Sequence, residues 1–511
     1  MFSLQIHFQR TYFYMKKKSS GKPISRGNFI KQTASSAGWL ILPRFVLGGR
    51  GYIAPSDKLY IAAIGCGGEG ENDIKHLAST PNKNSVIAFL CDVDERPAAA
   101  RRKEFPKAGF YQDWRILFEK EQKNFDAVTV AIPDHNHAVV GMAAMQLRKH
   151  LYLQKPLTHD IYEARKITEA AGYYQVVAQM GDQGASCDGM RTLQEWMDAK
   201  LIGDITKVYC WTNRPVWPQG IGWPKQTAAI PKELNWDLWL GTAPKTNYVD
   251  NLVPFNWRGW WRFGTGALGD MGCHIMGPPF KLLQLGYPTQ VSGSASTLYT
   301  GVFQEAAFPE SGPVSSNLLF TFSQPNGKQV ELIWMDGGII PERLAVLEPD
   351  LNMNEVLGDW PGDNDFEGAT LFIGTKGMVS CGWGGSHPRV LTPELKEKAL
   401  EIPASYPRVK GGADGHWWQW IDGCISGYNN AQLSSPFAGY AGPLTETVLL
   451  GNLLLQSFQQ QVKTPKGTSV ETSFPHRYKS LLWDGPNMRV TNMEAANQFV
   501  RRNYRAGWGK L

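Results

Sequence analysis

An aspartate and a histidine four residues apart are the first pair in this sequence whose types and spacing suggest chemistry. Asp270 and His274 lie in the glycine-rich stretch FGTGALGDMGCHIMGPP, residues 263–279. On a helix, positions four apart project from the same face. A histidine beside a carboxylate can accept the proton of a hydroxyl group while hydride leaves the same carbon. The alternative is a capped helix with a buried structural histidine. No third ligand is indicated, so we expect no metal site.

A lysine in a second motif could act on the same oxygen. Lys155 stands in Gln154-Lys155-Pro156, directly after the short apolar run 151–154. A lysine at the carboxyl end of a strand can polarise a hydroxyl or carbonyl oxygen. Pro156 restricts the preceding backbone and could carry a cis bond that turns the lysine inward. Taken alone, a lysine before a proline is more often a solvated loop residue.

A glycine-rich turn must position these groups against a cofactor. The apolar run 59–64 leads directly into Gly65-Cys66-Gly67-Gly68-Glu69-Gly70. In this pattern Gly65 permits a tight turn, Gly67 lets a pyrophosphate approach the backbone, and Gly70 lets the following helix pack closely. The helix N-terminus offers N–H groups and a positive dipole end to phosphates. The spacing predicts a dinucleotide site, and the alternative is an ordinary strand-turn-helix.

An acidic residue after the next strand favours NAD as the dinucleotide. The apolar run 86–90 ends in Cys91-Asp92-Val93-Asp94. An acid at the position of Asp92 accepts hydrogen bonds from an adenosine ribose diol. It would repel the additional phosphate of NADP, so we expect NAD.

Strand and helix patterns alternate through the first part of the chain, which predicts an α/β fold with a doubly wound parallel sheet. We place a Rossmann NAD(P)-binding domain at residues 57–182. Ligands bind such sheets at the carboxyl ends of the strands. Five residues at strand ends should therefore line one edge, and they are Gly65, Asp92, Pro133, Gln154 and Asp182.

The alternation ends at residue 183. Strand-like runs without intervening helices, at 206–212, 290–298, 316–322 and 329–335, predict an α+β domain with a large, mostly antiparallel open sheet. We assign residues 183–511 to this substrate-binding domain, with a closing segment from about residue 475. Eight tryptophans fall between Trp211 and Trp261, and they could form a sugar site or simply pack in a core.

Composition describes a folded protein with two domains. The chain has 511 residues, 42% of them hydrophobic and 19% charged. Residues 1–50 hold nine Lys or Arg and no acid, so the formal net charge of +6 becomes −3 for the rest. That balance gives no general attraction for nucleic acid. Seven scattered cysteines, without a C-x-x-C pair, predict neither a disulfide framework nor a zinc site.

The first 56 residues have the pattern of an export leader and linker. Lys16-Lys17-Lys18 precedes Ser25-Arg26-Gly27-Asn28-Phe29-Ile30-Lys31 and an apolar stretch from Ala34 to Leu42. The segment resembles a twin-arginine signal in which Gly27 replaces the second arginine. We expect a periplasmic or exported protein, and the alternative is a basic tail on a cytoplasmic one. The start is either Met1 or Met15. The apolar part is too short to cross a bilayer, and we expect no membrane span.

The order of these motifs resembles one family. GCGGEG, CDVD, IPDHNH, QKP and MGDQ follow one another as in the glucose–fructose oxidoreductase / inositol dehydrogenase / MocA family. The resemblance covers nearly all of the chain after Ser56. It implies a Rossmann domain, a C-terminal α/β domain and use of NAD or NADP on sugars or cyclitols. It also implies that the protein is a dimer or tetramer.

The resemblance assigns roles to individual residues. It implies that Lys155, Asp270 and His274 form the catalytic trio, with Asp270 orienting His274 or holding a substrate hydroxyl. It places Gly68 and Glu69 along the pyrophosphate. Cofactor contacts near the nicotinamide are then expected from the residues Pro133, Asp134, His137, Gln154, Lys155 and Asp182.

Two residues depart from the family pattern. The usual E-K-P is Q-K-P here, so Gln154 leaves Lys155 without an adjacent carboxylate. Asp182 stands where many relatives have asparagine. In the substrate site we expect Lys155, Asp270 and His274 together with Arg262, since arginines reach hydroxyls or carboxylates.

Three functions remain open from the sequence. The first is NAD-dependent hydride transfer between the cofactor and a secondary hydroxyl or ketone of a sugar, glycoside or cyclitol. The second is glycoside cleavage, in which a tightly held NAD oxidises a ring carbon transiently before elimination. The third is a sugar-binding protein without catalysis on the same fold, which Gln154 and Asp182 alone support.

Overall fold

The structure is a computed structural model, and it describes residues 57–511 apart from 307, 325–326, 342–367, 468 and 510. The leader predicted over residues 1–56 lies outside the described residues. Within the described ranges, no helix is both long and apolar enough to cross a membrane. Residues 57–511 pack as one compact unit, and the domain boundary at 182/183 stays a prediction.

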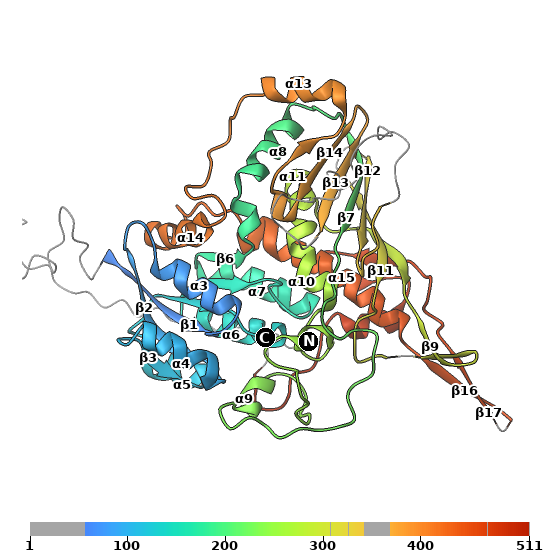
Figure 1. Ribbon diagram of the computed structural model, residues 1–511, viewed down its shortest axis with the longest axis horizontal. Coiled ribbons are helices and arrows are strands. Elements are labelled where there is room, and N and C mark those ends of the chain that lie inside the picture. Colours follow the sequence, from blue (N-terminus) through green and yellow to red (C-terminus); the bar gives the residue numbers. More distant parts are fainter. Residues whose placement is uncertain (1–56, 307, 325–326, 342–367, 468, 510) are drawn as a thin grey trace, which may run out of the picture. The chain divides into compact units, whose positions relative to one another are not determined.

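The first sheet has six strands, all parallel (Figure 1). Apolar runs of four to seven residues form its central strands, because both faces of the sheet are covered by helices. In spatial order the strands are β3 (Gly109–Tyr111), β2 (Ser85–Cys91), β1 (Leu59–Ile64), β4 (Ala127–Val130), β5 (His150–Gln154) and β6 (Ala178–Gly181). The order reverses beside β1, which is where a doubly wound sheet opens a crevice.

Five helices accompany this sheet: α3 (Glu69–Ala78), α4 (Glu95–Glu104), α5 (Trp114–Glu121), α6 (His137–Gln146) and α7 (Ile161–Tyr174). Aspartate side chains cap the N-termini of three of these helices. Asp94 and Asp113 accept from backbone N–H groups at the starts of α4 and α5. Asp160 and Glu163 form a reciprocal capping box at the start of α7. These caps fix the helix ends next to the strand ends that they follow.

In the part of the chain that the structure describes, the second sheet has nine strands and is antiparallel except for the pair β7 and β12. In spatial order they are β15 (Arg389–Val390), β14 (Met378–Gly382), β13 (Ala369–Gly374), β7 (Ile205–Trp211), β12 (Gln329–Met335), β11 (Ser316–Ser323), β8 (Gln290–Ala295), β18 (Leu481–Asp484) and β19 (Arg489–Val490). Burial alternates along β11, so one face packs on helices. The predicted fold class is confirmed.

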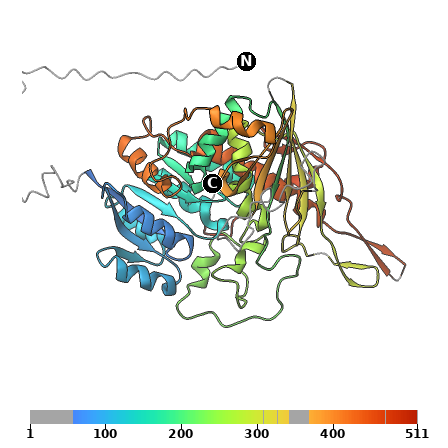
Figure 2. The same ribbon diagram turned by 45° about the horizontal axis from the view of Figure 1, so that its top comes forward.

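The second half contributes its own helices, two of which, α10 and α15, lie between the two sheets (Figures 1 and 2). They are α8 (Asp188–Asp198), α9 (Trp236–Leu240), α10 (Gly266–Ile275), α11 (Gly277–Leu282), α13 (Pro393–Glu401), α14 (Gly415–Ser426) and α15 (Gly442–Phe458). The largest, α15, is buried along nearly its whole length. A Cβ at Gly451 would lie 2.4 Å from Leu268 and 2.9 Å from Phe320, so glycine lets α15 approach both α10 and β11.

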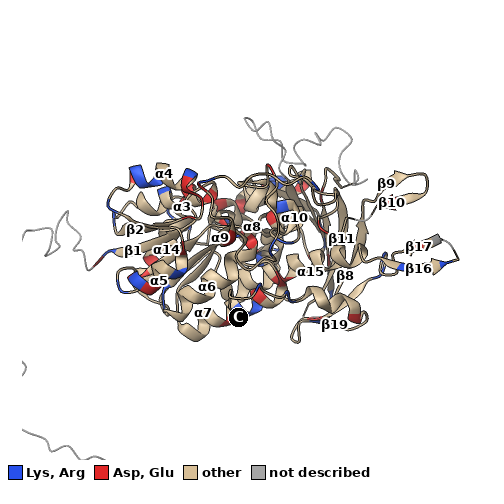
Figure 3. Cartoon of the chain, turned by 90° about the horizontal axis from the view of Figure 1, so that it is seen from below, with Lys and Arg blue, Asp and Glu red and all other residues tan. Residues whose placement is uncertain are grey.

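Two hairpins extend from the second sheet, β9 (Leu298–Gly301) with β10 (Gln304–Ala306), and β16 (Val462–Lys466) with β17 (Ser469–Ser473). Both project away from the helices in Figures 1 and 2. Basic and acidic residues are mixed along the described helices rather than separated onto two faces (Figure 3).

The end of the chain returns to the first sheet through Arg502. Its guanidinium donates to Glu163 Oε1 at 2.6 and 2.9 Å and to the hydroxyl of Thr242 at 3.0 Å. The backbone N–H of Arg502 donates to Asp160 at 3.1 Å. The side chains of Glu163 and Asp160 are buried, so this arginine neutralises the capping box of α7.

Removing this guanidinium should therefore destabilise the fold. We expect Arg502→Ala to lower the free energy of unfolding by roughly 3 kcal/mol, because a buried carboxylate pair loses its cation. Chemical denaturation of the purified protein measures this. The neighbouring exposed Arg501 is the matched control, and Arg501→Ala should change stability by less than about 1 kcal/mol. Equal effects of the two substitutions would contradict the prediction.

Candidate active site

A cavity of about 700 Å³ lies at the carboxyl ends of the parallel strands. It is lined from the first sheet by the glycine turn and the ends of β2, β4 and β5, and from the second half by α10, η5 (Trp383–Gly385) and the start of α14. Lys155, Asp270 and His274 all line it, together with Gly67 and Gly68. The structure thus brings the predicted trio and the nucleotide turn into one cavity.

The glycine turn fits a pyrophosphate. Gly65 has φ +97°, and a Cβ there would lie 2.1 Å from the carbonyl oxygen of Ala131, so only glycine fits. Gly68 has φ +53° with open space where a Cβ would stand. Among the described residues, no protein acceptor binds the N–H groups of Gly67, Gly68 and Glu69. These donors at the start of α3 are what a phosphate requires.

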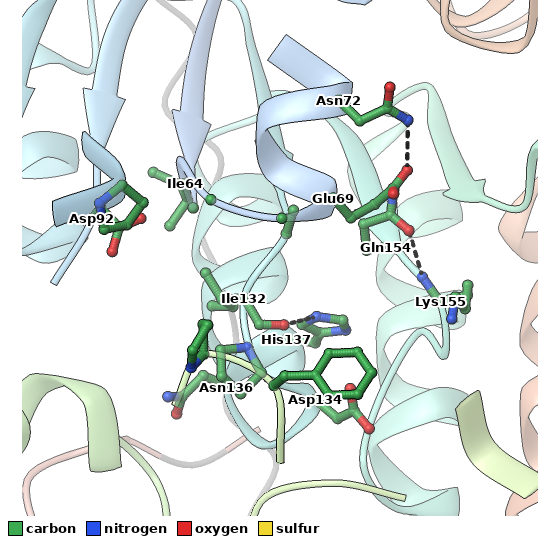
Figure 4. A pocket seen from close by; sticks show the side chains of 18 of the residues that line it. Ile64, Glu69, Asn72, Asp92, Ile132, Asp134, Asn136, His137, Gln154 and Lys155 are labelled. Atoms are coloured by element: carbon green, nitrogen blue, oxygen red, sulfur yellow. Dashed lines mark hydrogen bonds between the residues drawn. The ribbon is translucent and has the colours of Figure 1, made fainter. Parts of the chain in front are cut away.

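Asp92 lies at the opposite end of the cavity from Lys155 (Figure 4). Its carboxylate accepts from the N–H groups of Cys66 at 2.8 Å and Asp94 at 2.9 Å. Burial raises its pKa to about 6, against the lowering effect of these bonds. The carboxylate is therefore held in place, with lone pairs left to accept from a ribose diol.

Lys155 pairs with Asp270 across the cavity. The ammonium lies 3.0 Å from Asp270 Oδ1 and also donates to the Asp270 backbone oxygen at 3.0 Å. Arg258 Nε lies 3.3 Å from the same carboxylate oxygen. Burial alone would raise the pKa of Asp270, but Lys155 and then Arg258 overcome this and lower it to about 2. The Lys155–Pro156 peptide bond is cis.

The partner of His274 is Asp182, not Asp270. His274 Nδ1 lies 2.9 Å from Asp182 Oδ1, and the hydroxyl of Tyr440 donates to Asp182 Oδ2 at 3.0 Å. The ring of Trp383 lies against His274 with centroids 4.3 Å apart. Asp270 and His274 both lie on α10, as their spacing predicts, but each has a different partner. Asp182 comes from the end of β6, so no local pattern could reveal this contact.

The residues after β4 differ in whether their side chains are engaged by the backbone. Asp134 and Pro133 line the cavity, and Asp134 accepts from the hydroxyl of Thr265 at 2.7 Å. Burial raises the pKa of Asp134 to about 7, although this bond and Arg258 oppose the rise. His137 also lines the cavity, but its ring nitrogens lie 2.9 and 2.6 Å from the carbonyl oxygens of Pro156 and Ile132. Its ring is therefore engaged by the backbone on both sides.

Glu69 and Gln154 both have protein partners. The Glu69 carboxylate accepts from Asn72 at 3.0 Å and Gln183 at 2.8 Å, which leaves its backbone N–H for a phosphate. The amide nitrogen of Gln154 donates to the buried Asp73, and its oxygen accepts from the Lys155 N–H at 3.3 Å. Figure 4 shows the last of these contacts at the end of the cavity.

Gly70 does not line the cavity, although the glycine pattern groups it with residues that do. A Cβ there would lie 2.5 Å from the Gly65 carbonyl oxygen. Gly70 therefore allows the helix to pack closely on the strand.

The tryptophan-rich segment forms a separate small core rather than an open aromatic surface. Trp236, Trp239, Trp257 and Trp260 are buried together, although Trp239 and Trp257 reach the cavity wall. Arg262 lies on the ring of Trp223 at 4.6 Å and donates to Thr246. Arg258, rather than the predicted Arg262, is the arginine at the cavity. Sequence patterns also miss Trp383, because a single tryptophan in a glycine turn has no recognisable signal.

Fold and site together define a Rossmann-type protein with a cavity at its glycine turn and a lysine, an aspartate and a histidine around it. Residues 59–182 match the family model described as an oxidoreductase family with an NAD-binding Rossmann fold. Residues 202–293 match the model for the C-terminal alpha/beta domain of that family. Both matched segments thus resemble the glucose–fructose oxidoreductase / inositol dehydrogenase / MocA family, whose Rossmann fold is described as NAD-binding.

Individual relatives are distant. The chain is 30% identical over 107 residues to an inositol 2-dehydrogenase of Salmonella typhimurium, which is 21% of this chain and 31% of that protein. It is 20% identical over 192 residues to a levoglucosan dehydrogenase of Pseudarthrobacter phenanthrenivorans, 37% of this chain and 41% of that protein. The chain thus spans about a third of the length of the first of these relatives and less than half of the second.

A solved structure shows the same fold. A levoglucosan dehydrogenase in complex with NADH and levoglucosan superposes with a TM-score of 0.50 at 16% identity. The match covers 80% of this chain and all of that one. At this identity the likeness describes the fold and leaves the substrate open.

Asp134 should make stability depend on pH. Because its pKa is raised in the folded protein, the folded state retains a proton that the unfolded chain releases between pH 4 and about 7. Ionised Asp134 therefore destabilises the fold increasingly as pH rises through this window. Asp134→Asn should stabilise the cofactor-free protein by nearly nothing at pH 4 and by up to roughly 4 kcal/mol above pH 7.

Thermal unfolding from pH 4 to 8 measures this difference. Asp422→Asn, an exposed carboxylate on α14, is the matched control and should show no such trend. A stabilisation by Asp134→Asn that stays constant with pH would contradict the prediction.

Proposed function

We propose that the protein transfers hydride between NAD and a secondary hydroxyl or ketone of a sugar, glycoside or cyclitol. One observation carries the proposal: Lys155, Asp270 and His274 line the cavity that begins at the glycine turn, with Lys155 paired to Asp270 and His274 to the buried Asp182. The relatives are named as inositol and levoglucosan dehydrogenases, which agrees with a polyhydroxylated substrate.

Each residue in this site has a distinct task. His274 accepts the substrate hydroxyl proton at Nε2, because Nδ1 is engaged with Asp182. Asp182 orients the ring and stabilises its charged form, as carboxylates do for catalytic histidines. Lys155 stabilises negative charge on the reacting oxygen, and Asp270 holds its ammonium in place. Bound NAD supplies the hydride acceptor, with Gly67, Gly68 and Asp92 as its proposed contacts.

Trp383 is the proposed platform for the sugar ring. It lies beside His274 and is partly exposed to the cavity, whereas Trp236, Trp239, Trp257 and Trp260 are buried in a core of their own. Aromatic faces pack on the apolar faces of sugar rings. Arg258, held between the rings of Phe255 and Trp257, lies near enough to reach substrate hydroxyls.

The lining of the nucleotide cavity by the second half of the chain favours a second candidate, glycoside cleavage through transient oxidation by a retained NAD. Segments of the second half line the same cavity as the glycine turn, including Val253–Phe255 and Ala413 with Trp417. Leu234 also forms a β-bridge to Asp94, close to Asp92. Cleavage of a glycoside without net NADH release would favour this candidate. Export through the leader and a dimer or tetramer stay predictions.

Substitutions at His274 test the chemistry. We expect His274→Ala to lower kcat at least 100-fold, because general-base catalysis contributes about 10²–10⁴. Asp182→Asn should lower kcat by roughly 10-fold, since the ring keeps a partner but loses the stabilising charge. NADH absorbance with a panel of sugars and cyclitols measures both. His476→Ala, outside the cavity lining, is the control. Normal turnover by His274→Ala would remove this histidine from the mechanism.

Substitutions at Trp383 test the sugar platform. Trp383→Ala should raise the KM for sugar about 10-fold, because one face of the ring loses its aromatic contact. Trp383→Phe should recover part of the loss. The dissociation constant for NAD, measured by calorimetry, should change less than about threefold, since the platform faces the sugar. Equal weakening of NAD and sugar binding would show that Trp383 supports the cavity as a whole.

A further inference from the structure

A completely buried carboxylate lies behind the cavity on α3. Asp73 has no exposed surface, and no lysine or arginine of the described residues forms an ion pair with it. Its oxygens accept from the Gln154 amide at 3.0 and 3.1 Å and from the Trp417 indole at 2.7 Å. A buried carboxylate without a cation is costly and calls for a reason.

The two donors come from different parts of the chain, and both line the cavity. Gln154 ends β5 of the first sheet, and Trp417 lies in the first turn of α14. Trp417 also stacks on His76 with ring centroids 4.1 Å apart. Asp73 therefore joins α3, β5 and α14 at one point next to the proposed nicotinamide end of the cavity.

The contacts with Asp73 determine which way the Gln154 amide faces. Its nitrogen lies on Asp73, so its oxygen is left to accept from the backbone N–H of Lys155. Gly181 closes the other side, because a Cβ there would lie 2.5 Å from the amide nitrogen. The amide thus links the buried carboxylate directly to the backbone of the catalytic lysine.

The carboxylates of Asp73 and Glu69 disfavour a further carboxylate at the end of β5. Burial raises the pKa of Asp73, and nearby Glu69 raises it further, whereas the Trp417 and Gln154 bonds lower it. The hydroxyl of Tyr152 on β5 is another titratable group close to Asp73, and His76 lies behind Trp417. A carboxylate in place of the Gln154 amide would face Asp73 at hydrogen-bond distance, which is strongly unfavourable.

We infer that Asp73 is a positioning residue, which holds Gln154 and Trp417 in place and through Gln154 sets the backbone of Lys155. The inference rests on the proposed hydride transfer. Gln154 and Asp73 act as one unit with a single carboxylate. In this protein the carboxylate belongs to Asp73 on α3 and the amide to Gln154 at the end of β5. Exchanging the two groups, so that the carboxylate is on β5 and the amide on α3, should preserve the hydrogen bonds between them. In the exchanged protein, the new amide on α3 would donate to the new carboxylate at the end of β5 and accept from Trp417.

A double-mutant cycle tests this unit. We expect Asp73→Asn alone to lower kcat about 10-fold, because two amide NH₂ groups then face each other. Gln154→Glu alone should lower kcat about 10-fold at pH 8 and much less at pH 5, where the two carboxylates can share a proton. The double variant Asp73→Asn/Gln154→Glu should return to within about threefold of the unmodified enzyme and regain its pH profile. Asp422→Asn, an exposed carboxylate on α14, is the control for the loss of one carboxylate outside the unit.

Two results would overturn the inference. The first is a double variant whose kcat is no higher than the product of the two single effects predicts. The second is a loss of kcat in Gln154→Glu that is the same at pH 5 and pH 8. The dissociation constant for NAD, measured on the same four proteins, gives a readout besides turnover. If the unmodified protein turns over no sugar, the proposed function fails. In that case the NAD dissociation constants of the four proteins still test the positioning unit, and it is rejected if the effects of the two substitutions on NAD binding are simply additive in free energy.

Discussion

The ion pair between Lys155 and Asp270 is the interaction on which the rest of the site depends. One partner follows a strand of the parallel sheet and the other lies on α10 of the second half, 115 residues further along the chain. Both are largely shielded from water, so either charge alone would be costly to bury. The pair is therefore satisfied only when α10 is packed against the carboxyl ends of the strands. That same packing delivers His274 to the cavity.

Buried aspartates around the cavity show how one residue type is used in several ways. Asp270 faces two cations, and its pKa falls to about 2, whereas burial raises the pKa of Asp134, which has mainly a hydroxyl partner, to about 7. Asp182 faces an imidazole and a phenol, and Asp73 faces an amide and an indole. The same carboxylate group thus has a lowered or a raised pKa according to whether cations or neutral groups surround it.

Local signals in the sequence suffice for the first half of the fold. Short apolar runs followed by turn residues predict β1, β2 and β5, because strands buried on both faces need no alternation. Four stretches of the second half are also recognisable as strands, at residues 206–212, 290–298, 316–322 and 329–335. The strands β13 and β14 are not, since Thr370 and Ser380 interrupt the short apolar runs of Ala369–Gly374 and Met378–Gly382.

Sequence patterns do not reveal side-chain contacts between residues far apart in the chain. This explains why the predicted partners of the site residues differ from those in the structure. The spacing on a helix pairs Asp270 with His274, yet the folded chain brings the ammonium of Lys155 onto Asp270 instead. Asp182 is the partner of His274. From the sequence, Asp182 favours a protein without catalysis, whereas in the fold its carboxylate holds the ring of His274. Gln154 follows the same logic, since its amide is required by a carboxylate 81 residues away. Each departure from the family pattern thus has a compensating contact elsewhere, which is expected where buried charges must be balanced as a set.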